Sequence, residues 1–409
     1  SLITTSIIGL SLFALTYSVW GGLSAGAWTD VVQVIILILG GILMTGIALS
    51  YVTPSGGIID GLSYVYNAVP ERFSMILEKG QIITPDGRDA YFDLPGIAVL
   101  IGGMWIANTY YWGFNQYIIQ RTFAAKSLGE AQKGIAFAAF LKLIIPIFVV
   151  LPGIIAYVIN LDPSTGELMK VLPEGFTSSD GRILNDNAAP WLIKNYIPVG
   201  IKGLILAALA AAIVSSLASM LNSTSTIFTM DIYKEYINKN ATDSELVKIG
   251  RIVVIISLFI AMIIAPAFGN LGQVFQAIQE YTGVVSPGIL AVFIMGLFYK
   301  KATNNAAIWG ILLSIPVAMY FKVVPKGWIE FLPSFTHGLF IGEIPFLHQM
   351  GITFLITMFI IYVISYLEGN QDDPKGINLS GSLFETKPSF NIPAFAVLII
   401  TAMLYAIFW

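Results

Sequence analysis

The sequence contains no cysteine and only two histidines in its 409 residues. The absence of cysteine excludes disulfides, thiolate chemistry and cysteine-ligated metal sites, and two histidines are too few for a histidine-rich metal site. Charged residues make up only 11% of the chain, whereas an average soluble domain has about a quarter. The net charge of −3 favours neither a nucleic-acid partner nor a strongly basic protein of the membrane surface.

The sequence consists largely of long apolar runs, and 56% of its residues are hydrophobic. A water-soluble fold cannot hide this much apolar surface, because burial grows only slowly with chain length. In lipid every backbone polar group must be paired internally, which leaves helices or a closed barrel. The runs are about 20 residues long, rather than alternating segments of about ten, and therefore indicate helices. The chain is predicted to be an all-α polytopic membrane protein.

We interpret residues 1–409 as a single transmembrane domain. Its ten predicted spans are 2–20, 29–53, 95–120, 132–159, 202–229, 249–267, 272–298, 303–322, 347–367 and 391–408. The chain begins with Ser1, almost directly inside a span and without a preceding basic stretch, which argues against a signal peptide. We therefore expect a fragment that lacks N-terminal helices. Loops after odd-numbered spans carry a modest excess of Lys and Arg in short segments, which predicts that they are cytoplasmic and that Trp409 is outside.

A polar and aromatic stretch, residues 105–116, lies inside the third predicted span and follows Gly102-Gly103. Its Asn and Gln side chains offer amide donors and acceptors, and its Tyr and Trp rings offer flat apolar faces with a polar edge. This combination suits a sugar, and secondary transporters bind substrate at broken helices. The alternative is an interfacial aromatic belt, although Asn108 lies more than a turn inside the apolar run.

Two further spans carry isolated polar groups. Lys142 is ten residues into the fourth span, a depth of roughly 15 Å at helical rise. It is either a donor in a binding cavity or half of an internal ion pair. In the seventh span Gln279-Glu280 precedes Pro287, which allows a kink. Gln279 is a candidate donor to a ligand hydroxyl and Glu280 a candidate for an internal pair; the alternative is a polar hinge.

The fifth span contains residues 207–226, almost all of them small. Ser215 and Ser216 follow Ala212 by three and four residues, so two hydroxyls and a carbonyl share one helix face. Such oxygens suit sodium, a hard cation. The alternative is that the serines bond back to the preceding turn or join packed helices. Asp30, near the start of the second span, is either a helix cap or an acidic group on a cation exit path.

These residues carry a resemblance to the sodium–solute symporter family, most closely to its bacterial sodium/galactose branch. Residues 17–25 fit the family's signature of an aromatic and a small residue followed by Gly-Gly and an apolar residue. Near-verbatim matches to the branch cover residues 105–121, 132–142, 207–236 and 279–287. The resemblance implies the LeuT-like fold, with two inverted five-helix repeats, flanking helices and fourteen spans. The ten spans here correspond to the last ten, so the first two core helices, which supply the other half of both binding sites, are absent.

The resemblance also implies roles for the residues of the polar stretch and its partners. Asn108, Lys142 and Gln279 occupy positions that contact sugar hydroxyls. Tyr111 matches the aromatic gate that closes the sugar off from the cytoplasm, and Trp112 lies beside it.

The implied sodium site uses the carbonyl of Ala212 and the hydroxyls of Ser215 and Ser216. Asp30 matches an acidic position on the sodium exit path. Sodium is thus the expected coupling ion and a small sugar the expected substrate.

The function implied is sodium-coupled symport of a hexose, galactose or glucose, by alternating access across the cell's inner membrane. One alternative is a sodium symporter for another solute, such as an amino acid, a sialic acid or a vitamin. Another is a transporter-like sensor, which would need a cytoplasmic effector module. An intramembrane enzyme is disfavoured, since we find neither a metal cluster nor a nucleophile–base pair. The sequence leaves open which hexose is carried, the stoichiometry and the oligomeric state.

Overall fold

The computed structural model describes residues 2–84, 87–177, 183–270, 273–323, 344–374, 376–379 and 381–409. Helices dominate these residues, and the extended pairings among them are three isolated β-bridges. The chain divides into two compact units, which we describe separately. Unit 1 comprises Ser1–Phe73, Gln120–Val274 and Pro393–Val397, and unit 2 comprises Ser74–Ile119, Phe275–Ile392 and Leu398–Trp409.

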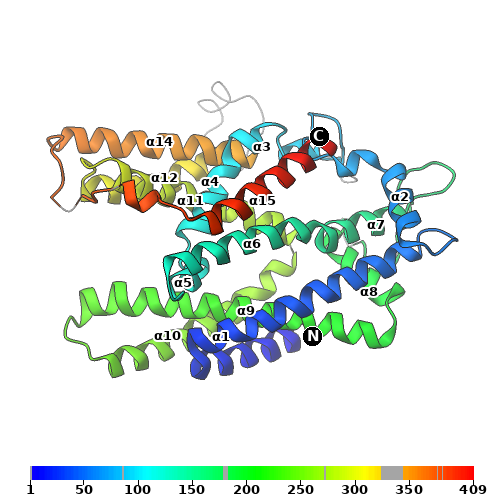
Figure 1. Ribbon diagram of the computed structural model, residues 1–409, viewed down its shortest axis with the longest axis horizontal. Helices are drawn as coiled ribbons and strands as arrows, with labels where there is room; N and C mark the ends of the chain where they lie inside the picture. Colours follow the sequence, from blue (N-terminus) through cyan, green and yellow to red (C-terminus); the bar gives the residue numbers. More distant parts are fainter. Residues whose placement is uncertain are drawn as a thin grey trace. The chain divides into compact units, whose positions relative to one another are not determined.

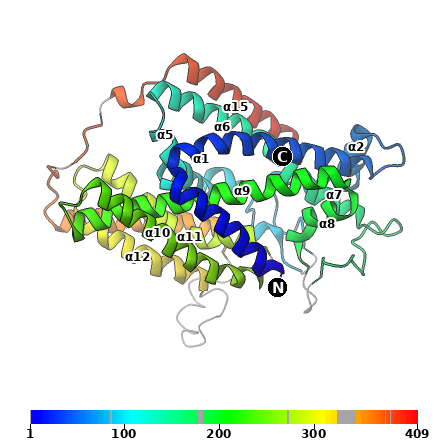
Figure 2. The same ribbon diagram turned by 90° about the horizontal axis from the view of Figure 1, so that it is seen from below.

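Unit 1 is built on its longest helix, α1, which begins at Leu2 and ends at Ser50. Figure 2 shows α1 as two arms that meet at an angle. Besides short 3-10 helices, the other helices of this unit are α2 (Ile58–Ala68), α6 (Leu128–Val149), α7 (Leu151–Ile159), α8 (Ala188–Tyr196), α9 (Val199–Thr226), its π-helical extension η5 (Ile227–Ile237) and α10 (Asp243–Ile264). The short helix α5 (Gln116–Phe123) enters unit 1 at Gln120.

Small residues let α1 approach its neighbours closely. Helix α1 packs along α9, and a Cβ added at Gly40 would lie 3.6 Å from Cγ1 of Ile205. At Gly41 an added Cβ would lie 2.6 Å from Cβ of Phe148 on α6, so only glycine fits there without a shift. Glycine at a helix interface brings the backbones together, as in other membrane helix pairs.

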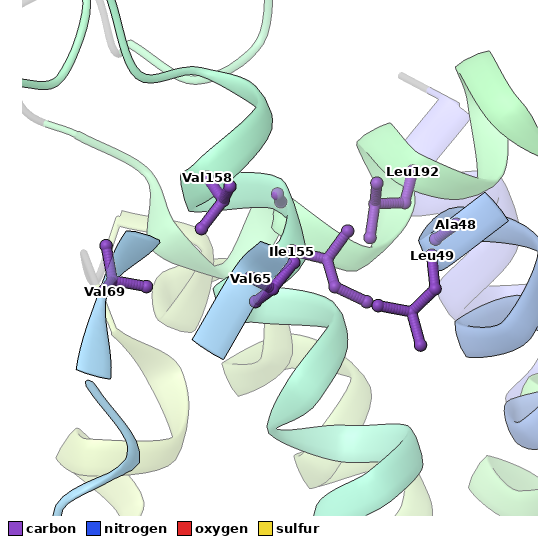
Figure 3. Packing of buried hydrophobic residues seen from close by; sticks show 8 residues of the cluster. Ala48, Leu49, Val65, Val69, Ile155, Val158 and Leu192 are labelled. Atoms are coloured by element: carbon purple, nitrogen blue, oxygen red, sulfur yellow. The ribbon is translucent and has the colours of Figure 1, made fainter. Parts of the chain in front are cut away.

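A compact apolar cluster closes one end of unit 1. Figure 3 shows Leu49 of α1, Val65 of α2, Ile155 of α7 and Leu192 of α8 gathered together. Val65, Ile155 and Leu192 are completely buried. Truncating one of the larger members to alanine would cost about 2–5 kcal/mol, so this cluster fixes the helix ends that it joins.

Unit 2 contains the interrupted third predicted span and most of the C-terminal helices. Its elements are α3 (Ala98–Ile101), α4 (Gly103–Thr109), the π-helical turn η3 (Tyr110–Phe114), α11 (Val274–Phe298, from Phe275 onward), α12 (Asn304–Val323) and α14 (Phe346–Leu367). Helices α12 and α14 lie side by side (Figure 1). Their close contact is at Gly310, where an added Cβ would lie 2.6 Å from Cγ1 of Ile361. The last helix, α15 (Pro388–Ile407), is divided between the two units and has no buried residue.

Eight helical segments are long and apolar enough to cross a membrane, counted over the described residues. They are Asp30–Ser50, Leu128–Ile159, Val199–Ile237, Asp243–Phe268, Val274–Phe298, Asn304–Val323, Phe346–Leu367 and Pro388–Ile407. The first predicted span, 2–20, falls in the first arm of α1, where Ile3–Thr16 is a shorter apolar stretch. The third, 95–120, is divided among α3, α4, η3 and α5. The protein is therefore a multi-pass membrane protein, while the division into ten spans stays a prediction.

Candidate substrate and cation sites

The interruptions of the third predicted span give its polar residues their positions. Helix α3 ends at Ile101, and the φ of −106° and ψ of −131° of the following residue, Gly102, are not helical. After α4, the chain widens into η3 and then becomes extended at Asn115, with φ −83° and ψ 116°. Asn115 starts the next helix by accepting a hydrogen bond from the backbone N–H of Tyr117 at 3.3 Å. The polar stretch therefore lies at a break between helices, where backbone and side-chain polar groups are available to a ligand.

Four of the five residues predicted to meet the sugar lie in unit 2. Asn108 is on α4, Tyr111 and Trp112 are on η3, and Gln279 is on α11. Asn108 and Gln279 are partly buried, and neither side chain makes a hydrogen bond to another described residue. Their amides can therefore serve a ligand. Lys142 is an exposed residue of α6 in unit 1.

Helix α14 supports both elements that carry the predicted amides. A Cβ added at Gly103 of α4 would lie 1.9 Å from the backbone oxygen of Leu347. One added at Gly283 of α11 would lie 3.1 Å from Sδ of Met350. Both Leu347 and Met350 are buried residues of α14. Two glycines thus seat α4 and α11 against the same helix, which holds Asn108 and Gln279 within one packed unit.

Tyr111, the predicted gate, is held by its neighbours. Its hydroxyl is hydrogen-bonded to that of Tyr117, and the two rings meet edge to face with centroids 5.9 Å apart. Trp112 makes a second edge-to-face contact, with centroids 5.1 Å apart. The sequence reasoning gave Tyr117 no role. A second tyrosine six residues after Tyr111, one position beyond the polar stretch, was the available signal, but the break at Asn115 obscures which groups face each other.

An aromatic stack joins η3 to α11. The rings of Phe114 and Phe293 lie nearly parallel, at an interplanar angle of 28° and with centroids 4.7 Å apart. Aromatic pairs of this kind add about 0.5–1.5 kcal/mol beyond their buried area. The stack ties the end of the polar stretch to the helix that carries Gln279.

Unit 2 also contains a charged pocket next to these elements. Arg88, Glu280, Lys322 and Gln349 contribute its polar lining. The predicted sugar residues Asn108, Tyr111 and Gln279 are not among the described residues that line it.

Unit 1 contains a polar cluster around Asp30. Its carboxylate accepts hydrogen bonds from the guanidinium of Arg121 and from the hydroxyl of Ser215. Arg121 also donates to Oγ of Ser219 at 2.5 Å, and Oγ of Ser219 donates to the backbone oxygen of Ser215 at 2.8 Å. The Asp30 and Arg121 side chains are 18% and 34% exposed. The acidic charge of Asp30 is thus balanced within the protein, by contacts that join α1, α5 and α9.

Arg121 is the functional candidate that the sequence reasoning missed. It ends the segment 105–121 that carries the resemblance, immediately after the predicted span 95–120, where it is one of the Lys and Arg residues of a short predicted loop. An arginine at the end of a membrane helix is usually interpreted as a residue that anchors the helix at the cytoplasmic surface. The ion pair of Arg121 is revealed only by the structure, in which side-chain contacts join α5 to α1 and α9.

The predicted sodium ligands lie on α9 as their spacing requires. Ala212 and Ser215 are partly buried and Ser216 is exposed. Among the described residues, no group of three or more His, Asp or Glu side chains is arranged to hold a metal ion. The polar atoms that these three residues of α9 offer are hydroxyl and carbonyl oxygens, which suit sodium.

Comparison with known proteins identifies the family. A sequence model of the sodium:solute symporter family matches residues 2–314. The chain belongs to this family. The sodium/glucose cotransporter of Vibrio parahaemolyticus is 53% identical over 406 residues, which are 99% of this chain and 70% of that protein. Sodium/glucose cotransporter 1 of mouse is 31% identical over 373 residues, 87% of this chain and 55% of that protein.

A solved structure of a substrate-bound, outward-open sodium-coupled sialic acid symporter has a similar fold. It superposes with a TM-score of 0.66 at 24% sequence identity, over 89% of this symporter chain and 66% of that one. The predicted family and the predicted all-helical transporter fold are thus confirmed. The roles of individual site residues stay predictions.

Proposed function

We propose that this symporter carries a hexose, galactose or glucose, into the cell together with sodium by alternating access. The observation that carries the proposal is the 53% identity, over 99% of the chain, to a protein named a sodium/glucose cotransporter. The free amides of Asn108 and Gln279 support it, because amides bind sugar hydroxyls as both donors and acceptors. Lys142 is the third proposed sugar contact, and Tyr111 with Trp112 forms the cytoplasmic gate.

Sodium is the proposed coupling ion and binds to the carbonyl of Ala212 and the hydroxyls of Ser215 and Ser216. Coupling then requires that sodium and sugar favour the same conformation, so that each ligand tightens the binding of the other. Asp30 lies next to this site through its hydrogen bond to Ser215. Arg121 already balances the charge of Asp30. The Asp30 carboxylate therefore attracts a departing sodium ion only weakly and does not hold it.

The proposed location is the inner membrane of the cell, with Trp409 outside. The Lys and Arg residues of loops such as 121–133 and 234–251 support this orientation, since positive residues concentrate in short cytoplasmic loops.

A sodium-dependent uptake screen tests the proposal. Full-length protein in sealed vesicles is given labelled glucose, galactose, sialic acid, proline and a vitamin, with sodium outside or with choline in its place. We expect uptake of at least one hexose that requires sodium and is competed by the unlabelled hexose. Sodium-driven uptake of only a non-hexose solute would refute the sugar assignment. Equal uptake with sodium and with choline would refute the coupling of sugar transport to sodium.

A further inference from the structure

A chain of polar contacts runs across unit 2 beside the proposed sugar residue Gln279. Lys322 of α12 places its Nζ 3.4 Å from Oε2 of Glu280 on α11 and 4.2 Å from the ring centroid of Tyr281. The Lys322 and Glu280 side chains are only 13% and 18% exposed. A pair so shielded from water is held firmly, because separating it leaves an uncompensated charge.

The contacts continue from Glu280 toward the start of α11 and beyond it. Nε2 of Gln276 donates to Oε1 of Glu280 at 3.4 Å and to Oδ1 of Asp93 at 3.2 Å. Asp93 in turn forms an ion pair with Arg88 at 3.0 Å. Gln276 and Glu280 are four residues apart and share a helix face. One face of α11 is thereby tied to α12 at Glu280 and to the segment 88–93 at Gln276.

The first turns of α11 expose much of their apolar surface, and the close contact with α14 comes only later, at Gly283. The apolar residues Phe275, Ile278 and Tyr281 are 73%, 48% and 57% exposed. Pro287 has no N–H to continue the helical hydrogen bonds, which weakens the link to the second half. The second half is packed closely, since a Cβ added at Gly288 would lie 2.0 Å from Oγ of Ser314. The polar contacts at Gln276 and Glu280 therefore anchor the first turns of α11, whose apolar residues are largely exposed.

Gln279 is in these turns, immediately before Glu280. Successive residues of an α-helix are about 100° apart around its axis. A helix face fixed at Gln276 and Glu280 therefore determines where Gln279 points. We propose that the Glu280–Lys322 ion pair is a positioning device, which sets the rotation of the first half of α11 and so aims the Gln279 amide at the substrate. The proposal rests on the sugar-binding role of Gln279 under the proposed function.

Transport kinetics give the first test. In full-length protein, Glu280→Gln and Lys322→Gln should each raise the sugar KM up to about fivefold, the loss expected when one neutral hydrogen bond is misaligned. The half-saturating sodium concentration and the maximal rate should change less than about twofold. The charge exchange Glu280→Lys with Lys322→Glu should recover most of the affinity. A merely structural pair would instead lower the amount of folded protein and leave KM unchanged, which would overturn the proposal.

A matched control and a milder variant keep the result interpretable. Glu130 and Lys133 form an exposed ion pair at 2.9 Å on α6, and Glu130→Gln should leave KM unchanged because such surface pairs contribute little. If the charge variants fail to fold, Gln276→Ala removes one neutral contact of the same chain. We expect it to raise KM about two- to threefold, and an unchanged KM would count against the proposal.

Thiol labelling separates the positioning of Gln279 from the identity of the substrate. The chain described here contains no cysteine, so Gln279→Cys introduces a single reporter in it, with the protein lacking that change as the background. Adding Glu280→Gln should change the rate of labelling by a small methanethiosulfonate reagent at least about threefold. Equal labelling rates would overturn the positioning role. This measurement needs no transport, so it distinguishes failure of this inference from failure of the proposed sugar function.

Discussion

The hydroxyl of Ser215 donates a hydrogen bond to the carboxylate of Asp30, and these residues are 185 positions apart in the sequence. One was predicted as a sodium ligand and the other as part of a sodium exit path. Their contact, with Arg121 on the same carboxylate, means that release of a cation from α9 and the charge balance of Asp30 are physically linked. Changes at any of the three should therefore affect the other two.

Removing Arg121 should destabilise the folded protein. Arg121→Gln leaves the Asp30 carboxylate, 18% exposed, without its counter-charge. We expect a loss of about 1–3 kcal/mol, between the values for exposed and buried pairs. Thermal unfolding in detergent measures it. Adding Asp30→Asn should restore part of the stability, and losses that simply add in the double variant would show that the pair is not coupled.

Ser216→Ala should weaken sodium dependence more than Ser215→Ala. The Ser215 hydroxyl is already engaged by Asp30, whereas Ser216 is exposed on α9 and makes no hydrogen bond to another described residue. We expect the half-saturating sodium concentration to rise about tenfold for Ser216→Ala and about two- to threefold for Ser215→Ala. Sodium-titrated uptake in vesicles decides this, and the same sodium dependence in all variants would refute the site on α9.

The membrane class, the family and the helical fold could be predicted because they depend on long apolar runs and extended motifs. The contacts within the sites could not. Glu280 was correctly given an internal partner, but nothing in the sequence singles out Lys322, 42 residues later, from the other cations near span ends. Likewise the contacts of Arg121 depend on where the fold places Asp30 of α1 and Ser219 of α9. Local sequence was more informative where backbone conformation alone determines the structure. Gly102, which has low helix propensity, lies at the break between α3 and α4.

Gln279→Ala and Lys142→Ala should abolish most sugar uptake while the protein still inserts in the membrane. Each removes a proposed donor to a sugar hydroxyl, at a cost of about 1 kcal/mol for a neutral group and about 1.5–3 kcal/mol for a charged one. The sugar KM should therefore rise more for Lys142→Ala than for Gln279→Ala. Uptake at several sugar concentrations measures this, with the amount of inserted protein as the control. Wild-type KM in both variants would remove these residues from the site.

Gly103→Ala should disturb the packing of α4 against α14. The added Cβ would lie 1.9 Å from the backbone oxygen of Leu347, and backbone cannot turn aside as a flexible side chain can. We expect a loss of about 1–3 kcal/mol from overpacking, seen as a lower unfolding temperature. Gly134→Ala on α6 is the control, because a Cβ there meets nothing within 4 Å. Equal behaviour of the two variants would contradict the close contact.

Acid should weaken the junction between α12 and the end of α14. The pKa of Glu368 is lowered, chiefly by the hydrogen bond from Thr303 and also by that from Asn305, whose Nδ2 lies 3.0 Å from Oε1. A carboxylate with a lowered pKa stabilises the fold above its usual pKa, and this contribution is lost as the pH falls through the lowered value. Unfolding temperatures of the native protein and of Glu368→Gln should therefore differ at about pH 7, and the difference should shrink as the pH falls below the usual glutamate pKa of about 4.3. A difference that stays constant over this range would show that the carboxylate charge does not stabilise the junction.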